Sequence, residues 1–170
     1  MGSGKTSVAN ELHTLSKYPI IETDQIIEDR VGMSIPDIFK TKGEPFFREQ
    51  EAEVCCSLST IRTPSIISTG GGLIMDKTNQ ACLKKLGTIF YLYAKQRTIL
   101  DRIQKEGGRP LLDNASNKQT TIQSLFSTRH PVYQSIADVT IFTDRLDPKQ
   151  VASHIFEQFQ VTSPFILGNI

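Results

Sequence analysis

The sequence predicts an α/β protein, a three-layer αβα sandwich in which helices cover both faces of a parallel sheet. Two observations support this fold class. Short segments with strand composition alternate with longer segments of helical periodicity, and polar or glycine-rich residues follow the predicted strands. Right-handed crossovers between parallel strands place the helices on both faces of such a sheet. A chain of 170 residues corresponds to one domain.

Four segments are predicted to be strands, because each is short, rich in Ile, Thr, Phe or Tyr, and bounded by Pro, Gly or Asp. They are residues 19–23, 64–69, 88–94 and 138–143. Between them apolar residues recur at helical spacing, as Val8, Leu12 and Leu15 do. Helices are expected over residues 5–17, 25–31, 45–58, 79–86, 95–105, 120–134 and 148–159.

The composition argues against several classes of partner. The net charge is +1 at pH 7, so the chain has no general attraction to nucleic acid or an anionic membrane. No apolar run approaches the roughly 20 residues of a membrane span. The three cysteines lack metal-ligand spacing and do not suggest a disulfide framework. No apolar signal segment opens the sequence. We therefore expect a cytoplasmic protein with no nucleic-acid or membrane partner.

The segment Gly2-Ser3-Gly4-Lys5-Thr6 contains most of the phosphate-binding motif G-x-x-x-x-G-K-[ST], the P-loop. Its glycines let backbone N–H groups point at phosphate oxygens, the lysine reaches the β- and γ-phosphates, and the Thr hydroxyl binds Mg²⁺. A flexible tag with two glycines is the alternative. An amphipathic helix follows directly, as the motif requires, and favours the P-loop.

The motif is incomplete in this sequence. Its first glycine, and the strand that leads into the loop, would lie before Met1. That strand is central in P-loop proteins, so we expect a sheet that lacks its first central strand. Residues 161–170 extend past the last predicted helix as a C-terminal tail, and the sequence assigns them no role.

Acidic residues and glycines follow two of the predicted strands. Glu22 and Asp24 end the first strand, where one carboxylate could help to hold Mg²⁺ and the other could accept a proton from an attacking hydroxyl. Asp24 as an ordinary helix N-cap is the alternative. The run 70–72 is Gly-Gly-Gly, which suits either a plain loop or a close approach of the backbone to a ligand.

Three arginines are candidates for binding anions. Arg48 and Arg129 together could clamp a carboxylate, although Arg48 could equally pair with Glu49 or Glu51 on the surface. Arg109 follows two glycines in a polar stretch that suits a hinged flap, where an arginine stabilises charge on a transferring phosphoryl group. A plain surface loop is the alternative for that stretch.

Taken in order, these residues resemble shikimate kinases, which belong to the nucleoside monophosphate kinase-like P-loop enzymes. The resemblance runs from Gly2 to about Pro148 and rests on an ordered set of motifs. They are GSGKT at 2–6, Glu22-Thr23-Asp24, GMSIPDIF at 32–39, Gly43-Glu44, F-R-x-x-E at 47–51, TGGG at 69–72, RPLL at 109–112 and Arg129-x-x-x-Tyr133.

The resemblance implies a P-loop NTPase fold and transfer of the γ-phosphoryl group of ATP to the 3-hydroxyl of shikimate, in the pathway to chorismate and the aromatic amino acids. It implies that Asp24 is the base, with Lys5 and Arg109 also catalytic. The nucleotide would contact Gly2, Ser3, Gly4, Lys5, Thr6, Ser7, Arg102, Arg109 and Arg145. Shikimate would contact Asp24, Phe39, Phe47, Arg48, Gly70, Gly71, Gly72 and Arg129. Thr6 and Glu22 would hold Mg²⁺.

The organisation that follows is a single kinase domain over residues 1–160, with a lid at about 107–120, acting as a monomer. Glu22 departs from the family pattern, which has Asp there, and its extra methylene moves the carboxylate toward the metal. Two alternatives stay open: a related small-molecule kinase of the gluconate kinase type, and a non-catalytic fragment. The second rests on the missing first strand.

Overall fold

The parallel sheet has five strands in the order β1-β2-β5-β3-β4. The computed structural model describes residues 3–106, 118–158 and 165–168. The strands are β1 (Ile20–Glu22), β2 (Ile66–Ser68), β3 (Thr88–Tyr93), β4 (Val139–Phe142) and β5 (Phe165–Gly168), and every pairing is parallel. The predicted α/β fold class is thus confirmed, and the first four strands lie within the segments predicted for them.

The middle of the sheet corrects one expectation from the sequence. The central strand is present, and it is β5, from the end of the sequence. Ile66 and Ile67 of β2 pair with Phe165 and Ile166 on one side of it, and Thr88 to Tyr91 of β3 pair with it on the other. Residues 161–170 are therefore not a tail without a role, since the part of them that the structure describes forms this strand.

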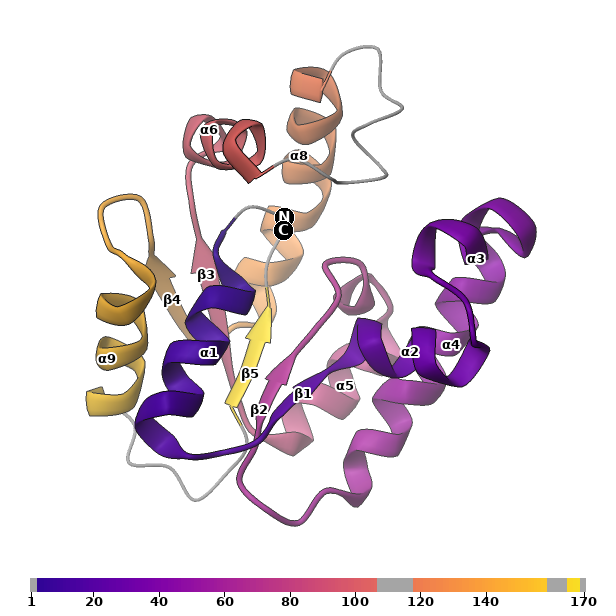
Figure 1. Ribbon diagram of the computed structural model, residues 1–170, viewed down its shortest axis with the longest axis horizontal. Helices are drawn as coiled ribbons and strands as arrows, with labels where there is room; N and C mark the ends of the chain where they lie inside the picture. The colour runs from indigo at the N-terminus through magenta and orange to yellow at the C-terminus, as the bar shows by residue number, and fades with distance from the viewer. Residues whose placement is uncertain (1–2, 107–117, 159–164, 169–170) are drawn as a thin grey trace.

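Helices lie on both faces of the sheet (Figure 1). They are α1 (Lys5–Ser16), α2 (Thr23–Val31), α3 (Ile35–Thr41), α4 (Gly43–Ser57), α5 (Lys77–Leu86), α6 (Gln96–Glu106), α8 (Lys118–Ile136) and α9 (Pro148–Gln158). Short 3₁₀ turns cover Leu58–Thr60 and Leu73–Met75. The expected helices are all found, with ends that differ by a few residues. Helix α3 was not predicted, because its apolar pattern is short.

Two apolar cores hold the layers together. On one face, Val8 and Leu12 of α1 and Ile155 of α9 pack with Phe90 and Leu167 of the sheet. On the other face, Leu83 of α5 and Tyr133 and Ile136 of α8 pack with Tyr91 and Ile166. Because β5 contributes Leu167 to one core and Ile166 to the other, its alternate side chains join both layers.

Helices α2, α3 and α4 form a unit beside the sheet with an apolar cluster of its own. Ile27, Ile38, Phe47 and Val54 are buried in it. The hydroxyl of Ser34 caps α3 by accepting a hydrogen bond from the backbone N–H of Asp37 at 3.3 Å. This unit and the carboxyl edge of the sheet border a common space, which is where ligands bind in open α/β sheets.

Candidate active site

The start of α1 has the features of a phosphate site. Gly4 precedes the helix with φ of 88°, a left-handed conformation that favours glycine. The Ser3 hydroxyl is buried and has no hydrogen-bond partner within the described part of the chain. Lys5 Nζ donates to the carbonyl oxygen of Thr69, at the end of β2. Thr6 and Ser7 are exposed in the first turn, and Gly2 lies outside the described residues.

Asp24 lies in the first turn of α2, directly after β1. It does not cap the helix, because Glu22 occupies the N-cap position. Its Oδ1 atom is buried, with no hydrogen-bond partner among the residues described. Burial raises the pKa of this carboxyl group above its ordinary value, an effect that the positive charges of Lys5 and Arg48 partly oppose. Asp24 is therefore a desolvated carboxylate on which the charges of two cationic side chains act.

The glycine run after β2 makes room for side chains. A β-carbon on Gly70 would lie 3.2 Å from Asp24 Cγ and still closer to its Oδ1, and one on Gly72 would lie 2.9 Å from Arg48 Cζ. Within the run, the Gly70 N–H donates to Thr23 Oγ1 at 3.0 Å, so this amide is already engaged. The sequence suggested a close approach to a ligand, and what approaches these glycines in the structure is Asp24 and Arg48.

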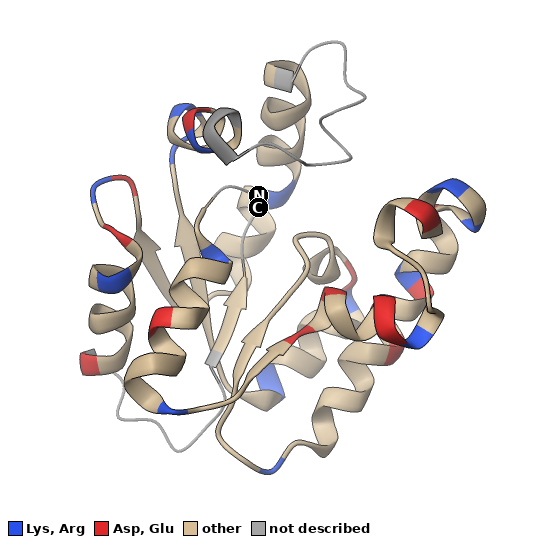
Figure 2. Ribbon diagram, in the orientation of Figure 1, with Lys and Arg blue, Asp and Glu red and all other residues tan. Residues whose placement is uncertain are grey.

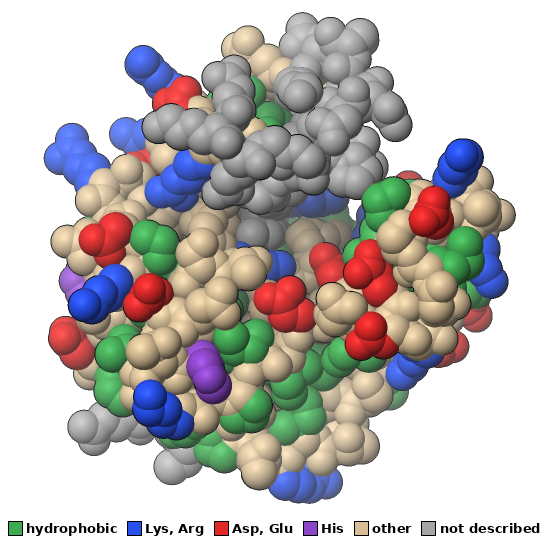
Figure 3. Space-filling model, in the orientation of Figure 1, with side chains coloured by type: hydrophobic (Ala, Val, Ile, Leu, Met, Phe, Trp, Pro, Cys, Tyr) green, Lys and Arg blue, Asp and Glu red, His purple; other side chains and the backbone are tan. Residues whose placement is uncertain are grey.

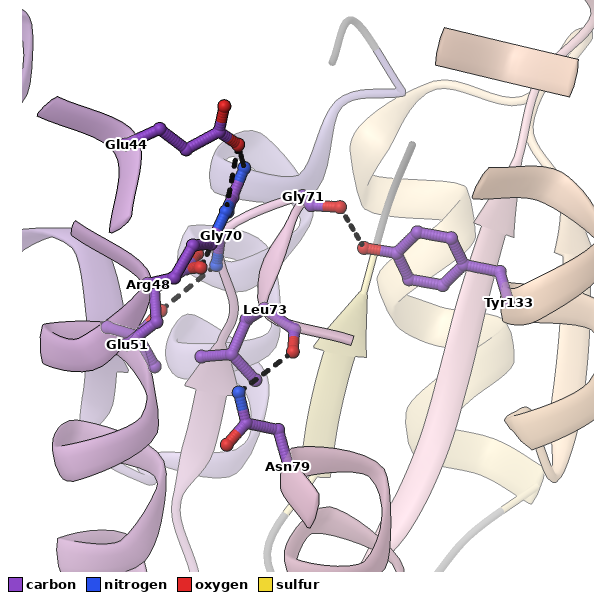
Figure 4. Close-up of polar contacts among 9 residues, drawn as sticks. Glu44, Arg48, Glu51, Gly70, Gly71, Leu73, Asn79 and Tyr133 are labelled. Carbon is purple, nitrogen blue, oxygen red and sulfur yellow. Dashed lines mark hydrogen bonds and ion pairs between the residues drawn. The ribbon is translucent and has the colours of Figure 1, made fainter. Parts of the chain in front are cut away.

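Arg48 lies between two carboxylates of its own helix (Figure 4). It contacts Glu51 at 2.6 Å and Glu44 at 2.7 Å. Burial lowers the pKa of Arg48, but the hydrogen bonds that it donates to Glu51 and Glu44, together with their negative charges, outweigh this effect and leave the pKa above its ordinary value. Glu51 is only 2% exposed, and burial raises its pKa despite Arg48. The sequence offered Glu51 as a surface partner, but it is a buried group that orients Arg48. Glu49 is exposed instead.

Arg129 of α8 is the second arginine of the predicted clamp. It is 8% exposed, and no hydrogen bond or ion pair links it to another described residue. Burial lowers its pKa, and the charge of Arg48 acts in the same direction, while Glu51 opposes them. The structure thus brings Arg48, Glu51 and Arg129 into one electrostatic neighbourhood.

A residue that sequence reasoning left without a role joins α8 to the glycine run. Tyr133 lies one helical turn after Arg129 and donates its hydroxyl to the Gly71 carbonyl at 3.4 Å (Figure 4). Its ring is fully buried and stacks on Tyr91 of β3, with ring centroids 5.0 Å apart. The spacing of Arg129 and Tyr133 showed a shared helix face, but not that this face meets Gly71.

The two phenylalanines assigned to the substrate pocket contact each other. Phe39 and Phe47 have ring centroids 4.8 Å apart, and Arg48 Cζ lies 5.5 Å from the centroid of Phe47. Phe47 is 5% exposed, so most of it belongs to the α2–α4 core, while Phe39 is partly accessible.

Arg102 and Arg145 were predicted to contact the nucleotide. Arg102 of α6 donates to the carbonyl of Thr143 at 2.7 Å and to its hydroxyl at 3.2 Å. Asp144 accepts from the Lys95 backbone and the Thr98 hydroxyl, which fixes the segment after β4 against α6. Arg145 is exposed in that segment. Arg109 and most of the predicted lid lie outside the described residues.

The molecular surface is hollowed between the α2–α4 unit and the part built on α1, with basic and acidic side chains at its edges (Figure 3). Acidic residues gather on the α2–α4 side, at the end of β1 and along α2 (Figure 2). A cleft that has a phosphate site on one side and arginines with a buried carboxylate on the other suits transfer of a phosphoryl group to a small anionic acceptor.

The family model for shikimate kinase matches residues 1–160. The chain belongs to the shikimate kinase family. A shikimate kinase of Pseudomonas entomophila is 37% identical over 168 residues, covering 96% of this chain and 94% of that protein. One from Coxiella burnetii is 38% identical over 167 residues, covering 95% and 90%. The resemblance expected from the motifs is thus confirmed, and with it an ATP-dependent kinase that acts on shikimate.

Solved structures agree with the fold. A shikimate kinase from Acinetobacter baumannii in complex with shikimate superimposes with a TM-score of 0.85 at 34% identity, covering 93% of this chain and 87% of that one. The shikimate kinase from Aquifex aeolicus gives a TM-score of 0.77 at 32% identity, covering 92% and 90%. The P-loop NTPase architecture is therefore shared with the family.

The residues at the start of α1 fit the phosphates of a nucleotide. The partnerless buried hydroxyl of Ser3, the left-handed Gly4 and the amino end of α1 suit phosphate oxygens. No group of three or more His, Cys, Asp or Glu side chains that would hold a metal occurs among the described residues.

Proposed function

We propose that this chain transfers the γ-phosphoryl group of ATP to the 3-hydroxyl of shikimate, with Asp24 as the base. The position of the Asp24 carboxylate carries the proposal. It lies against Gly70 after β2, and the charges of Lys5 from the phosphate motif and of Arg48 from the arginine clamp both act on it. Its buried oxygen without a partner is suited to accept a hydrogen bond from the attacking hydroxyl.

The arginines would select the substrate by its carboxylate. Arg129 is buried without an ion-pair partner among the described residues, which is costly unless an anion binds it. Arg48, fixed by Glu51 and Glu44, would supply the second guanidinium. Gly71 and Gly72 would border the bound acceptor, and the rings of Phe39 and Phe47 would wall its pocket. Gluconate also carries a carboxylate, so the two arginines select an anionic acceptor, and an assay with both substrates distinguishes shikimate from gluconate.

On the nucleotide side, Ser3, Gly4, Lys5, Thr6 and Ser7 would bind phosphates, and Arg102 and Arg145 would lie by the adenine. Gly2 and Arg109 are proposed for the loop and the lid on sequence grounds. Mg²⁺ would be held by Thr6 and Glu22, and its chemical contribution is to neutralise charge on the phosphates. Phosphoryl transfer then depends on what the chain does: orient the hydroxyl at Asp24, hold the acceptor and exclude water.

The proposal extends to a monomeric, cytoplasmic enzyme that binds neither nucleic acid nor membrane. The net charge of +1 supports the absence of those two partners. Within the described residues, no helix combines the length and apolar character that a membrane span requires. The alternative of a non-catalytic fragment rested on the missing central strand, and it loses that support because β5 fills the position.

The test is a coupled assay of ADP release from ATP and Mg²⁺, with shikimate and with gluconate. We expect release that depends on shikimate and is absent with gluconate. Asp24→Asn should reduce kcat by on the order of 10²–10⁴-fold, the usual contribution of a general base. Turnover with gluconate but not shikimate, or full activity of the Asp24→Asn variant, would contradict the assignment.

A further inference from the structure

Arg129 lies in a turn of α8 whose backbone is weakened by a proline. Pro131 stands inside the helix, two residues after Arg129. A proline has no N–H to donate to the carbonyl four residues before it, and its ring crowds that carbonyl. The backbone hydrogen bonds of α8 therefore hold this turn less firmly than a regular helix would. Contacts between its side chains and the sheet can supply what the backbone lacks.

His130, the residue between Arg129 and Pro131, is tied to β3. Its Nδ1 atom shares a hydrogen bond with the hydroxyl of Tyr91 at 2.9 Å. The imidazole also stacks on Phe126, one helical turn earlier, with ring centroids 5.0 Å apart. Burial raises the pKa of the Tyr91 hydroxyl, which therefore keeps its proton at neutral pH. A buried polar group of the sheet thus holds the residue next to Arg129.

The ring of Tyr91 holds the next turn of α8 as well. Tyr133 stacks on it with ring centroids 5.0 Å apart and 15° between the ring planes. Both rings are fully buried, and a β-carbon on Gly168 would lie only 2.6 Å from Tyr133 Cε1, so the Tyr133 ring has little room to move. The Tyr133 hydroxyl donates to the carbonyl of Gly71 (Figure 4). Tyr91 therefore contacts α8 on both sides of Pro131.

We propose that Tyr91 is a positioning residue for Arg129, a role that rests on the proposed binding of the shikimate carboxylate by Arg129. The hydrogen bond with His130 and the stacking with Tyr133 hold the turn of α8 so that the Arg129 guanidinium faces the acceptor. Tyr91 is fully buried and acts on the substrate only through α8.

The geometry of arginine binding explains why such a support matters. A guanidinium binds a carboxylate most strongly through two parallel N–H···O bonds, which require a fixed orientation of its plane. A shift of the turn leaves the positive charge of Arg129 nearby but misaligns these bonds. Loss of the Tyr91 hydroxyl should therefore weaken shikimate binding without abolishing it, and should leave the nucleotide site at α1 unaffected.

Tyr91→Phe tests the proposal, because it removes the hydroxyl and keeps the ring that stacks on Tyr133. The matched control is Tyr93→Phe on the same strand. The Tyr93 ring lies 5.3 Å from the His130 ring between centroids, and its hydroxyl makes no hydrogen bond within the described part of the chain.

In Tyr91→Phe we expect the KM for shikimate to rise on the order of fivefold, the value of one hydrogen bond, with kcat and the KM for ATP unchanged. Tyr93→Phe should leave all three constants as they are. An equal rise in both KM values, or the same effect in Tyr93→Phe, would overturn the proposal. His130→Phe removes the same hydrogen bond from the helix side and should reproduce the effect, which keeps the test available if Tyr91→Phe does not fold.

A double-mutant cycle shows whether Tyr91 acts through Arg129. In the Arg129→Met background, Tyr91→Phe should raise the KM for shikimate no further, because the group that it positions is gone. A rise as large as in the parent enzyme would overturn the proposal. An unchanged KM in Tyr91→Phe, where Arg129→Met raises it, would do the same.

Hydrogen exchange without substrate reports on the turn itself and separates this proposal from the proposed function. We expect the amides of residues 129–136 to exchange faster in Tyr91→Phe than in the parent and in Tyr93→Phe. Equal exchange in all three would overturn the role of Tyr91. Faster exchange in Tyr91→Phe, with a KM for shikimate that Arg129→Met does not change, would keep the support of the turn by Tyr91 and refute the carboxylate role of Arg129.

Discussion

Asp24 and Gly70 approach each other so closely that a β-carbon at position 70 would overlap the Asp24 carboxylate. The two residues follow neighbouring strands, since β1 and β2 pair in register from Ile20 with Ile66 to Glu22 with Ser68. Thr23 reinforces the contact, because its hydroxyl accepts the Gly70 N–H. The Asp24 carboxylate thus occupies space that a side chain at position 70, just after β2, would fill.

Gly70→Ala should therefore displace Asp24. We expect kcat to fall by on the order of 10²-fold, the cost of a displacement of about 1 Å in a reacting group. The overpacking should also lower the free energy of unfolding by about 1–3 kcal/mol. Steady-state kinetics and urea unfolding measure the two effects.

Gly32→Ala is the control for Gly70→Ala. Gly32 has φ of 71° and open space around its missing side chain. Alanine there should cost about 1 kcal/mol of stability from backbone strain and leave kcat unchanged. A normal kcat in Gly70→Ala, or an equal loss of kcat in Gly32→Ala, would show that the contact with Asp24 does not determine activity.

Ionised Asp24 should make the enzyme less stable at neutral pH. Burial raises the pKa of its carboxyl group above the ordinary value of 3.8. Between the unfolded pKa and the raised folded pKa, the folded state binds more protons than the unfolded state. The free energy of unfolding therefore falls as pH rises through this window, and the loss persists above it.

Asp24→Asn removes this titration while nearly preserving shape. The variant should melt at a higher temperature than the parent at pH 7, and the difference should shrink as pH approaches 3.8. Each kcal/mol corresponds to about 2–4 °C for a chain of this size. Calorimetry at several pH values measures it. A lower melting temperature for Asp24→Asn at pH 7 would mean that the ionised form of Asp24 is well compensated by Lys5 and Arg48.

The two carboxylates that pair with Arg48 should contribute very differently to stability. The Glu51 side chain is 2% exposed and that of Glu44 is 61% exposed, although their contacts with Arg48 are nearly equal in length. Removing one partner of a buried pair costs about 3–5 kcal/mol, whereas an exposed pair contributes about 0–1 kcal/mol. Because Arg48 is half-buried, we expect Glu51→Gln to lower the free energy of unfolding by less than a fully buried pair would. The loss should still be well above that for Glu44→Gln.

Urea unfolding of Glu51→Gln and Glu44→Gln measures these losses of free energy of unfolding. The KM for shikimate reports whether Arg48 keeps its position. We expect KM to rise more in the Glu51 variant. Equal effects of the two substitutions would mean that burial of Glu51 does not matter to the placement of Arg48.

The sheet and its helices could largely be predicted from the sequence, because their signals are local. Ile20 and Ile66 stand in short β-branched runs, and Val8 and Leu12 show helical spacing. The role of residues 165–168 could not, because a short apolar segment near the end of a sequence gives no sign of which strands it will pair with. The P-loop motif led to the prediction that the central strand is missing from the sheet, and this was wrong because β5 occupies the centre.

At the site, residue types were predictable and relationships were not. Arg48, Arg129 and Asp24 have chemistry that points to anions and proton transfer, so their selection needed only the sequence. The burial of Glu51 and the contact of Tyr133 with Gly71 depend on packing between α4, α8 and the turn after β2. Such contacts arise from tertiary packing, which local sequence patterns do not indicate.

Arg129 provides the last prediction. Its guanidinium is buried and lacks a partner among the described residues, and burial lowers its pKa together with the charge of Arg48. Arg129→Met should therefore leave stability unchanged or raise it slightly, since it removes a desolvated charge. The KM for shikimate should rise by on the order of 10–100-fold, the value of hydrogen bonds to a charged group, while the KM for ATP changes little. Arg62→Met is the control, because Arg62 is exposed and, within the part of the chain that the structure describes, bonds only the Ser59 carbonyl. Steady-state kinetics with each substrate varied in turn measures both constants, and an unchanged KM for shikimate would exclude Arg129 from the carboxylate site.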